Sequence, residues 1–266
     1  MASMDEALSL LTAANSHGDL TVKLSSLKQA KDVLLSLEPS LAAELFPSLV
    51  ELQYSPEGIV RQKLVEVIEE IGLKAMENCS ILIPVLLGLL RDNDSVVARE
   101  SIVSGTHLYC GVLEEMALQC HRRGKVERWL EGLWIWMLKF KDAVFAIALE
   151  PGPVGIKLLA LKFLETYILL FTTETTDSDR LVAEGSRRLF NISWVAGGHP
   201  VLDPVSLMSD ANKTLVILLD FLWSPGSLPG ALMIAVVNCM LTNSLMRNYW
   251  AWILLHWWFR QWELQG

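Results

Sequence analysis

Two histidines and two cysteines in the middle of the chain come closest to a metal-binding set. His107 and Cys110 would share one face of a helix, and the adjacent pair Cys120 and His121 follows. Structural zinc sites use ligand pairs separated by about two to four residues. Adjacent side chains on a helix diverge by ~100°, so Cys120 and His121 do not converge on one ion. The spacing predicts buried thiols and ordinary polar histidines, with no metal ion and no cofactor.

Paired carboxylates are the other groups that could do chemistry. They occur as Glu69-Glu70 and Glu114-Glu115, in stretches with helical periodicity. Neighbours on a helix point in different directions, so we expect solvent-facing side chains rather than a general acid and base. The sequence contains no glycine-rich phosphate loop, nucleophile elbow or His-Glu-x-x-His motif. These observations predict a protein that is not an enzyme.

One basic cluster is present, at residues 121–128 with the sequence His-Arg-Arg-Gly-Lys-Val-Glu-Arg. It could contact a phosphate or an acidic partner, or it could be a solvated turn between helices. It lacks the interleaved aromatic residues that stack on nucleic-acid bases. The chain as a whole has 22 Lys and Arg against 30 Asp and Glu, a net charge of −8. This balance argues against direct sequence-specific binding of nucleic acid.

The composition bounds the class of protein. With 266 residues, 52% of them hydrophobic and 20% charged, the chain is folded, and it is long enough that a non-compact architecture is plausible. Four cysteines fall at unrelated spacings, and Asp5 and Glu6 stand where a secretory segment would be basic. We therefore expect an intracellular protein with reduced thiols.

The dominant pattern is helical. Within Ile59–Met76, the apolar residues recur on one stripe, with Ser55 as the expected cap and Pro56 just before the helix. No alternating strand pattern is present. Similar patterns predict helices over Ala30–Leu37, Ser40–Leu52, Ile81–Leu90, Ser95–Leu118, Val126–Leu149, Ile156–Phe171, Asn212–Trp223 and Ala231–Met240.

Three segments begin alike, at residues 55, 92 and 150, with turn-forming residues followed by β-branched residues and a basic residue. Val60 and Val97 are 37 residues apart, close to the ~40 residues of HEAT-type helix pairs. The next step, to Ile156, is 59 residues and would include an extra helix. The pattern favours an all-α fold, a HEAT-like α-solenoid of antiparallel helix pairs, over an irregular bundle. We expect the turns at Pro56, Asp92–Asp94 and Pro151–Pro153 to lie along one ridge.

Two segments interrupt this pattern. Residues 172–206 are rich in turn-forming residues and predict a long loop, with a short helix near 181–189 as the alternative for part of it. Residues 241–266 form a Trp-rich tail, since five of the ten tryptophans lie between Trp250 and Trp262.

The helix expected over Ile156–Phe171 is apolar on two sides. Its broad face is apolar throughout, and its opposite face has a charged centre between leucines. A helix of this kind needs two layers of cover, of which the second is either a neighbouring helix or a partner protein. The residues of the second face that we expect to bind a partner are Leu158, Leu161, Lys162, Glu165 and Thr166.

An ordered set of segments resembles the N-terminal HEAT domain of the symplekin family, from about residue 5 to about residue 239. The matching stretches are Leu24–Leu37, Tyr54–Ile71, Leu89-Leu-Arg-Asp-Asn-Asp-Ser-Val-Val97, Gly155–Glu165, and Gly198-His-Pro200 leading into Leu215–Leu222. The resemblance implies a nuclear, non-catalytic scaffold of pre-mRNA cleavage and polyadenylation.

The resemblance also implies partners. In this family the N-terminal repeats bind, on their concave face, a phosphatase of the C-terminal tail of RNA polymerase II, together with other polyadenylation factors. Lys162 matches the family's lysine in the corresponding helix. The implied contact surface is therefore the second face of the helix over Ile156–Phe171.

The resemblance ends after Cys239, which predicts a family domain over residues 1–240 and a divergent tail over 241–266. Such an ending is typical of an alternatively spliced or frame-shifted product. The alternative function is a membrane-associated helical protein, acting through residues 221–259, because Phe221–Met246 contains no charged residue. The strongly apolar stretch Tyr249–Phe259 is shorter than the ~20 residues that span a bilayer.

Overall fold

The computed structural model describes residues 3–16, 18–172, 190–195, 197–223 and 229–242. These residues are helical or irregular, and no strand occurs among them. The chain divides into two compact units, residues 1–119 with 126–150 and residues 120–125 with 151–266. Each unit is described by itself.

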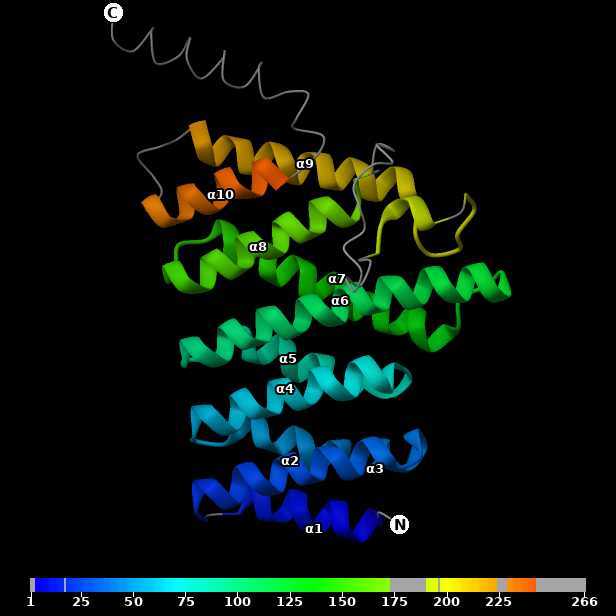
Figure 1. Cartoon of the computed structure of the whole chain (residues 1–266), viewed down its shortest axis with the longest axis vertical. Coiled ribbons are helices and arrows are strands. Elements are labelled where there is room, and N and C mark those ends of the chain that lie inside the picture. The colour runs from blue at the N-terminus through cyan, green and yellow to red at the C-terminus, as the bar shows by residue number, and fades with distance from the viewer. Residues whose placement is uncertain (1–2, 17, 173–189, 196, 224–228, 243–266) are drawn as a thin grey trace, which may run out of the picture. The chain divides into compact units, whose positions relative to one another are not determined.

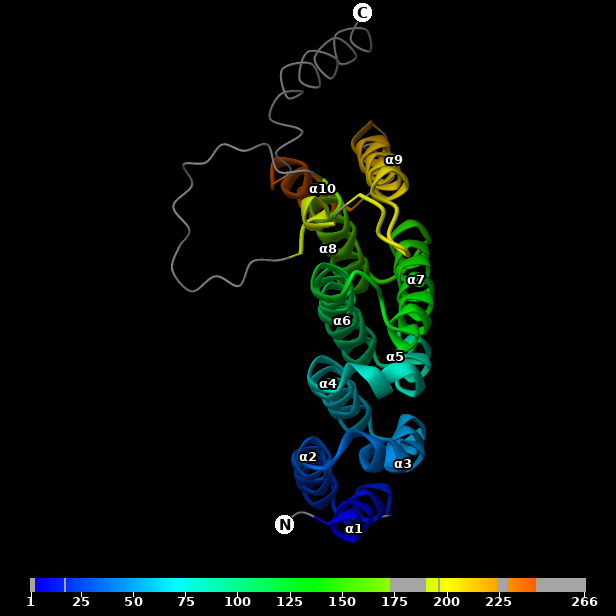
Figure 2. The same cartoon turned by 90° about the vertical axis from the view of Figure 1, so that its right-hand side faces the viewer.

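The first unit is a stack of antiparallel helix pairs (Figure 1). In the side view, α2, α4 and α6 form one layer, and α3, α5 and α7 form the other (Figure 2). The predicted all-α, HEAT-like arrangement is confirmed. Its elements are α1 Met4–Asn15, α2 Leu20–Ser36, α3 Pro39–Val50, the 3₁₀ turn Glu51–Tyr54, α4 Gly58–Lys74, the 3₁₀ turn Met76–Ile81, α5 Ile83–Leu89, α6 Ser95–Arg123 (whose last turn belongs to the second unit) and α7 Arg128–Leu149.

A 37-residue register relates the three helices of the first layer. Positions separated by this step in α2, α4 and α6 are buried together, because each helix turns the same stripe toward the core. The step from Val60 to Val97 is confirmed, and a further repeat precedes it, in which Lys23 occupies the equivalent buried position. The equivalent buried residues are Lys23, Val60 and Val97; Leu27, Leu64 and Ser101; Ala30, Val67 and Ser104; and Leu34, Ile71 and Leu108.

Ion pairs connect the turns before these helices. Lys23 Nζ lies 2.8 Å from Glu57 Oε1, which satisfies a buried ammonium at the start of α2. Arg61 pairs with Asp92, and a Cβ at Gly58 would overlap Asp94 Oδ2, so the turns at Pro56 and Asp92–Asp94 lie side by side as predicted. The third expected turn, Pro151–Pro153, belongs to the second unit.

The expected cap of α4 is wrong. Ser55 lies too far before the helix, and its hydroxyl donates to Glu57 Oε2 at 2.7 Å instead. Glu57 is the residue that precedes the helix, and its side chain makes no capping hydrogen bond. The Ser55 side chain therefore stabilises the turn rather than the first helical N–H groups.

The second unit contains α8 Val154–Leu170, the 3₁₀ turn Ile192–Trp194, α9 Pro204–Trp223 and α10 Gly230–Thr242. The three α-helices contact one another. α9 begins at Pro204, inside the segment expected to be a loop and eight residues before the expected start. The short helix expected near 181–189 lies outside the described residues.

The residues just before and within the 3₁₀ turn Ile192–Trp194 pack against the end of α8. The Phe190 ring lies 6.2 Å from that of Phe171, and Asn191 Nδ2 donates to the carbonyl of Thr172 at 2.9 Å. Because Phe190, Asn191 and Ile192 are buried, this part of the expected loop belongs to the core of the second unit.

Candidate partner-binding site

The exposed side of α8 carries three of the five residues that the sequence singled out, Leu158, Lys162 and Thr166. Leu158 and Thr166 are half-buried, whereas the Lys162 side chain is 67% exposed. Leu169 follows at 39% exposure. The spacing of these four residues places them on one side of the helix. We call Leu158, Lys162, Thr166 and Leu169 the α8 stripe.

Two of the predicted binding residues are not on this surface. Leu161 is 3% exposed and Glu165 is 5% exposed. Burial, together with the nearby Glu165 carboxylate, raises the pKa of the Cys239 thiol, on α10, to about 12. A neighbouring helix, α10, therefore lies close to Glu165. For this part of the second face, the cover is a helix of the same chain rather than a partner protein. The remaining predicted residues, Leu158, Lys162 and Thr166, stay accessible.

A buried carboxylate holds the exposed cation of the stripe. Lys162 Nζ lies 2.7 Å from Glu165 Oε2, and the Thr166 hydroxyl donates to the Lys162 carbonyl at 3.0 Å. An ammonium has three donors, so one contact to Glu165 leaves capacity for an acceptor on a partner. The stripe thus offers one positioned cation between two leucines.

The histidine and cysteine set is dispersed into other roles. His107 Nδ1 lies 2.6 Å from Glu69 Oε1, on α4, and Cys110 is buried, which raises the pKa of its thiol to about 12. Within the described ranges, no group of three or more histidine, cysteine or acidic side chains is placed to hold a metal ion.

The adjacent carboxylates Glu69 and Glu70 differ from the expectation that both face solvent. Glu69 accepts hydrogen bonds from Ser104 and His107 of α6, whereas Glu70 Oε2 accepts from Lys31 of α2 at 2.8 Å. The two side chains point in different directions from α4, so they do not form an acid–base pair. Each binds a different neighbouring helix. The pair therefore links α4 to the helices on both sides.

The basic cluster begins in the last turn of α6. His121, Arg122 and Arg123 lie in that turn and are exposed. Cations at this position are favourable because the helix C-terminus carries a partial negative charge. Gly124, with φ 66°, ends the helix, and its N–H donates to the Cys120 carbonyl at 2.8 Å. These three residues of the cluster are therefore solvated at the end of a helix, as the second of the two alternatives expects.

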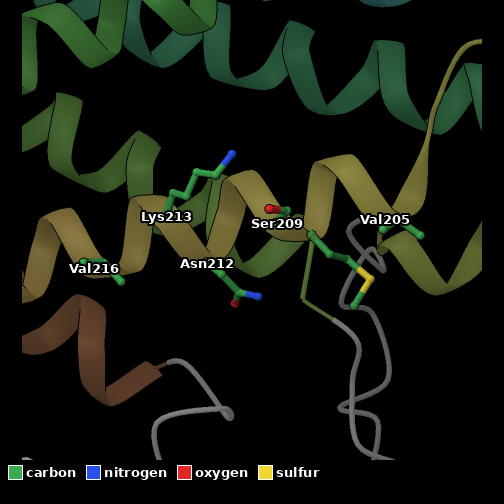
Figure 3. A pocket seen from close by; sticks show the side chains of 6 residues that line it. Val205, Ser209, Asn212, Lys213 and Val216 are labelled. Carbon is green, nitrogen blue, oxygen red and sulfur yellow. The ribbon is translucent and has the colours of Figure 1, made fainter.

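A shallow hollow on the second unit lies along a single helix. Figure 3 shows Val205, Ser209, Asn212, Lys213 and Val216 on successive turns of α9, with Met208 completing the lining. An enzyme site needs polar groups from several elements that converge on one point. Side chains projecting from one exposed helix do not meet this requirement.

The family assignment rests on a direct comparison. A family model described as Symplekin/PTA1 N-terminal matches residues 94–249, more than half of the chain. The chain belongs to this family. Membership supports a scaffold role in mRNA 3′-end processing. The match includes all of α8 and ends nine residues beyond the expected domain boundary at residue 240, while the resemblance of earlier segments remains an expectation.

The membrane alternative concerned residues 221–259. Of the helices in the described part of the chain, none combines the length and the apolar composition that crossing a bilayer demands. Residues 224–228 and 243–259 fall outside that part.

Proposed function

We propose that the chain is a nuclear, non-catalytic scaffold of pre-mRNA cleavage and polyadenylation, and that the α8 stripe binds a phosphatase of the C-terminal tail of RNA polymerase II. The observation that carries this proposal is the family match over residues 94–249, which includes the helix of Lys162. The geometry of the stripe supports it, because an exposed cation flanked by leucines suits a protein surface better than a small substrate.

The proposed contact has a polar centre and apolar flanks. Lys162 would meet a carboxylate or a carbonyl of the phosphatase, while Leu158 and Leu169 would lose their remaining contact with water. Glu165 has a supporting role, since its buried carboxylate restrains the ammonium before binding and so lowers the entropy cost of ordering a long side chain. Other polyadenylation factors would bind elsewhere on the scaffold.

The central test replaces Lys162 by glutamine, which removes the charge without placing a second carboxylate beside Glu165. We expect the affinity for the phosphatase, measured by isothermal titration calorimetry, to fall on the order of tenfold. Lys213→Gln is the matched control, because Lys213 is 72% exposed and pairs with Asp210 at 2.9 Å in the same three-residue spacing. Equal affinities for the two variants would place the phosphatase elsewhere.

A second pair of variants tests the apolar flank. Leu158→Gln should weaken binding, whereas Val216→Gln, on the exposed side of α9, should leave it unchanged. Circular dichroism of each variant checks that helical content is retained. A loss of binding with both variants would indicate a contact that is not confined to the α8 stripe.

A further inference from the structure

Three aliphatic residues of the first unit are exposed at the same position of successive repeats. Val22 of α2, Ile59 of α4 and Val96 of α6 are 50%, 49% and 39% exposed. They are separated by 37 residues, the step that also relates the buried positions of these helices. Single exposed aliphatic residues are common, but a repeated one is a feature of the surface as a whole. We call these three residues the aliphatic row.

The row is continuous along the layer formed by α2, α4 and α6. These helices run in the same direction in Figure 1. The ion pair of Lys23 with Glu57 joins the beginning of α2 to the beginning of α4. Gly58, next to Ile59, lies against Asp94, two residues before Val96. Because equivalent residues of parallel helices in register point in the same direction, the three side chains form one line.

Polar residues border the row on the same helices. One turn further along, the equivalent positions hold Ser25, Gln62 and Arg99, none of which is buried. The apolar surface is therefore one residue wide and crosses the helices rather than following one of them. A narrow line of this kind suits a linear segment better than the broad face of a folded domain.

The spacing of the row identifies the conformation of such a segment. Packed helices lie about 8–10 Å apart. A polyproline II chain rises ~3.1 Å per residue with three residues per turn, so equivalent side chains recur every ~9 Å. An extended segment with an apolar residue at every third position therefore matches one side chain to each repeat.

The net charge of the first unit indicates which residues such a segment would carry between its apolar positions. The first unit contains 11 Lys and Arg against 21 Asp and Glu, a net charge of −10, whereas the second contains 11 against 9. Asp19 and Asp94 stand beside the row, where they accept hydrogen bonds from the N–H groups of Thr21 and Val96. In the described part of the unit, no lysine or arginine lies within ion-pair distance of either of them, although Asp94, after Asp92, contributes to the raised pKa of Arg61.

We propose that the aliphatic row binds an extended, basic segment of a partner protein that carries an apolar side chain at every third residue. Its aliphatic side chains would cover Val22, Ile59 and Val96, and its lysines or arginines would pair with Asp19 and Asp94. This surface lies in the first unit and is separate in residues from the α8 stripe.

The test uses the full chain and a fluorescein-labelled peptide, (Val-Lys-Pro)₄, with binding followed by fluorescence anisotropy. We expect saturable binding. Ile59→Gln should weaken it on the order of fivefold, because the peptide would cover the exposed half of the isoleucine side chain, and glutamine removes that apolar contact. Leu73→Gln is the matched control on the same helix, because Leu73 is 42% exposed but lies at the other end of α4. It should leave binding unchanged.

Two further peptides separate the spacing from the charge. A peptide of the same composition with its valines grouped together should bind at least fivefold more weakly, and (Val-Glu-Pro)₄ should not bind. Equal binding of the grouped peptide would overturn the proposal in favour of non-specific attraction to an acidic surface. Sedimentation velocity provides the last measurement. If the wild type forms a dimer that Ile59→Gln dissociates, the row binds a second copy of the chain and the proposal is overturned.

Discussion

Arg61 of α4 forms a two-point ion pair with Asp92, 31 residues later in the sequence, at 2.7 Å from Nε and 2.8 Å from Nη2. The third nitrogen of the guanidinium donates to the carbonyl of Ser55 at 2.6 Å. One side chain therefore joins the turn before α4 to the turn before α6. Both partners are largely buried, with 14% and 7% of their side chains exposed.

The first prediction concerns this ion pair. Arg61→Ala should lower the free energy of unfolding by about 2–4 kcal/mol, because it leaves the Asp92 carboxylate buried without its cation. Arg99→Ala is the control, since Arg99 is exposed and bonds only the Ser95 carbonyl in its own helix; its effect should stay within about 0.5 kcal/mol. Urea unfolding followed by circular dichroism measures both. Similar losses would show that the pair adds nothing beyond surface charge.

The likeness of the turns before α4 and α6 explains why the sequence predicts the repeat. Val60 and Val97, which follow these turns, are both buried and give the 37-residue step. The basic residues Arg61 and Arg99 are not equivalent in this step, because Arg61 aligns with Ala98 and Arg99 aligns with Gln62. The same step places a repeat at Lys23, but hydrophobic periodicity does not show it. A lysine occupies the buried position there, and only the tertiary contact with Glu57 makes that burial favourable.

A second prediction follows from His107 and Glu69. The hydrogen bond that His107 donates to Glu69 raises the pKa of His107 above its usual 6.5, and the nearby Glu100 carboxylate adds to this effect. The histidine therefore contributes stability that is fully present below pH 6.5 and is lost as the pH rises through the folded-state pKa. The difference in urea midpoint between the wild type and His107→Gln should shrink from pH 6 to pH 8. A constant difference would mean that His107 does not change its protonation between the folded and unfolded states.

The face proposed to bind a partner was predictable in part. The amphipathic pattern predicts two apolar sides for α8, and the family resemblance singles out Lys162. Neither could show that Glu165 would be buried, because its cover comes from the fold around it, including α10, which lies more than 60 residues later in the sequence. A charged residue on a helix is usually exposed, so its burial can be recognised only when the packing of distant helices is known.

The third prediction compares two glycines that the sequence does not distinguish. A Cβ at Gly105 of α6 would overlap the ring of Phe140 on α7, which lies in the core of the first unit. Gly105→Ala should therefore destabilise the chain by about 1–3 kcal/mol through overpacking. Gly132 of α7 has open space around it, so Gly132→Ala should instead stabilise by about 0.5–1 kcal/mol through higher helix propensity. Thermal melts of the two variants should shift in opposite directions. A shift in the same direction would show that the α6–α7 contact is looser than this geometry requires.

The fourth prediction concerns His199 in the irregular segment before α9. His199 is buried, and its Nδ1 accepts hydrogen bonds from the backbone N–H groups of Val201 and Leu202 at 3.2 and 2.9 Å. The preceding Gly198 has φ 89°, a conformation that only glycine adopts at low cost, so the Gly-His-Pro sequence forms one specific turn.

His199→Leu should lower the free energy of unfolding by about 1–3 kcal/mol, because it leaves the N–H groups of Val201 and Leu202 without an acceptor. His199→Asn should recover part of the loss, since an asparagine carbonyl can accept a hydrogen bond from the N–H two residues later. Denaturant titration of the three proteins provides the measurement. Equal destabilisation by both substitutions would show that packing of the imidazole ring, rather than its acceptor nitrogen, stabilises the turn.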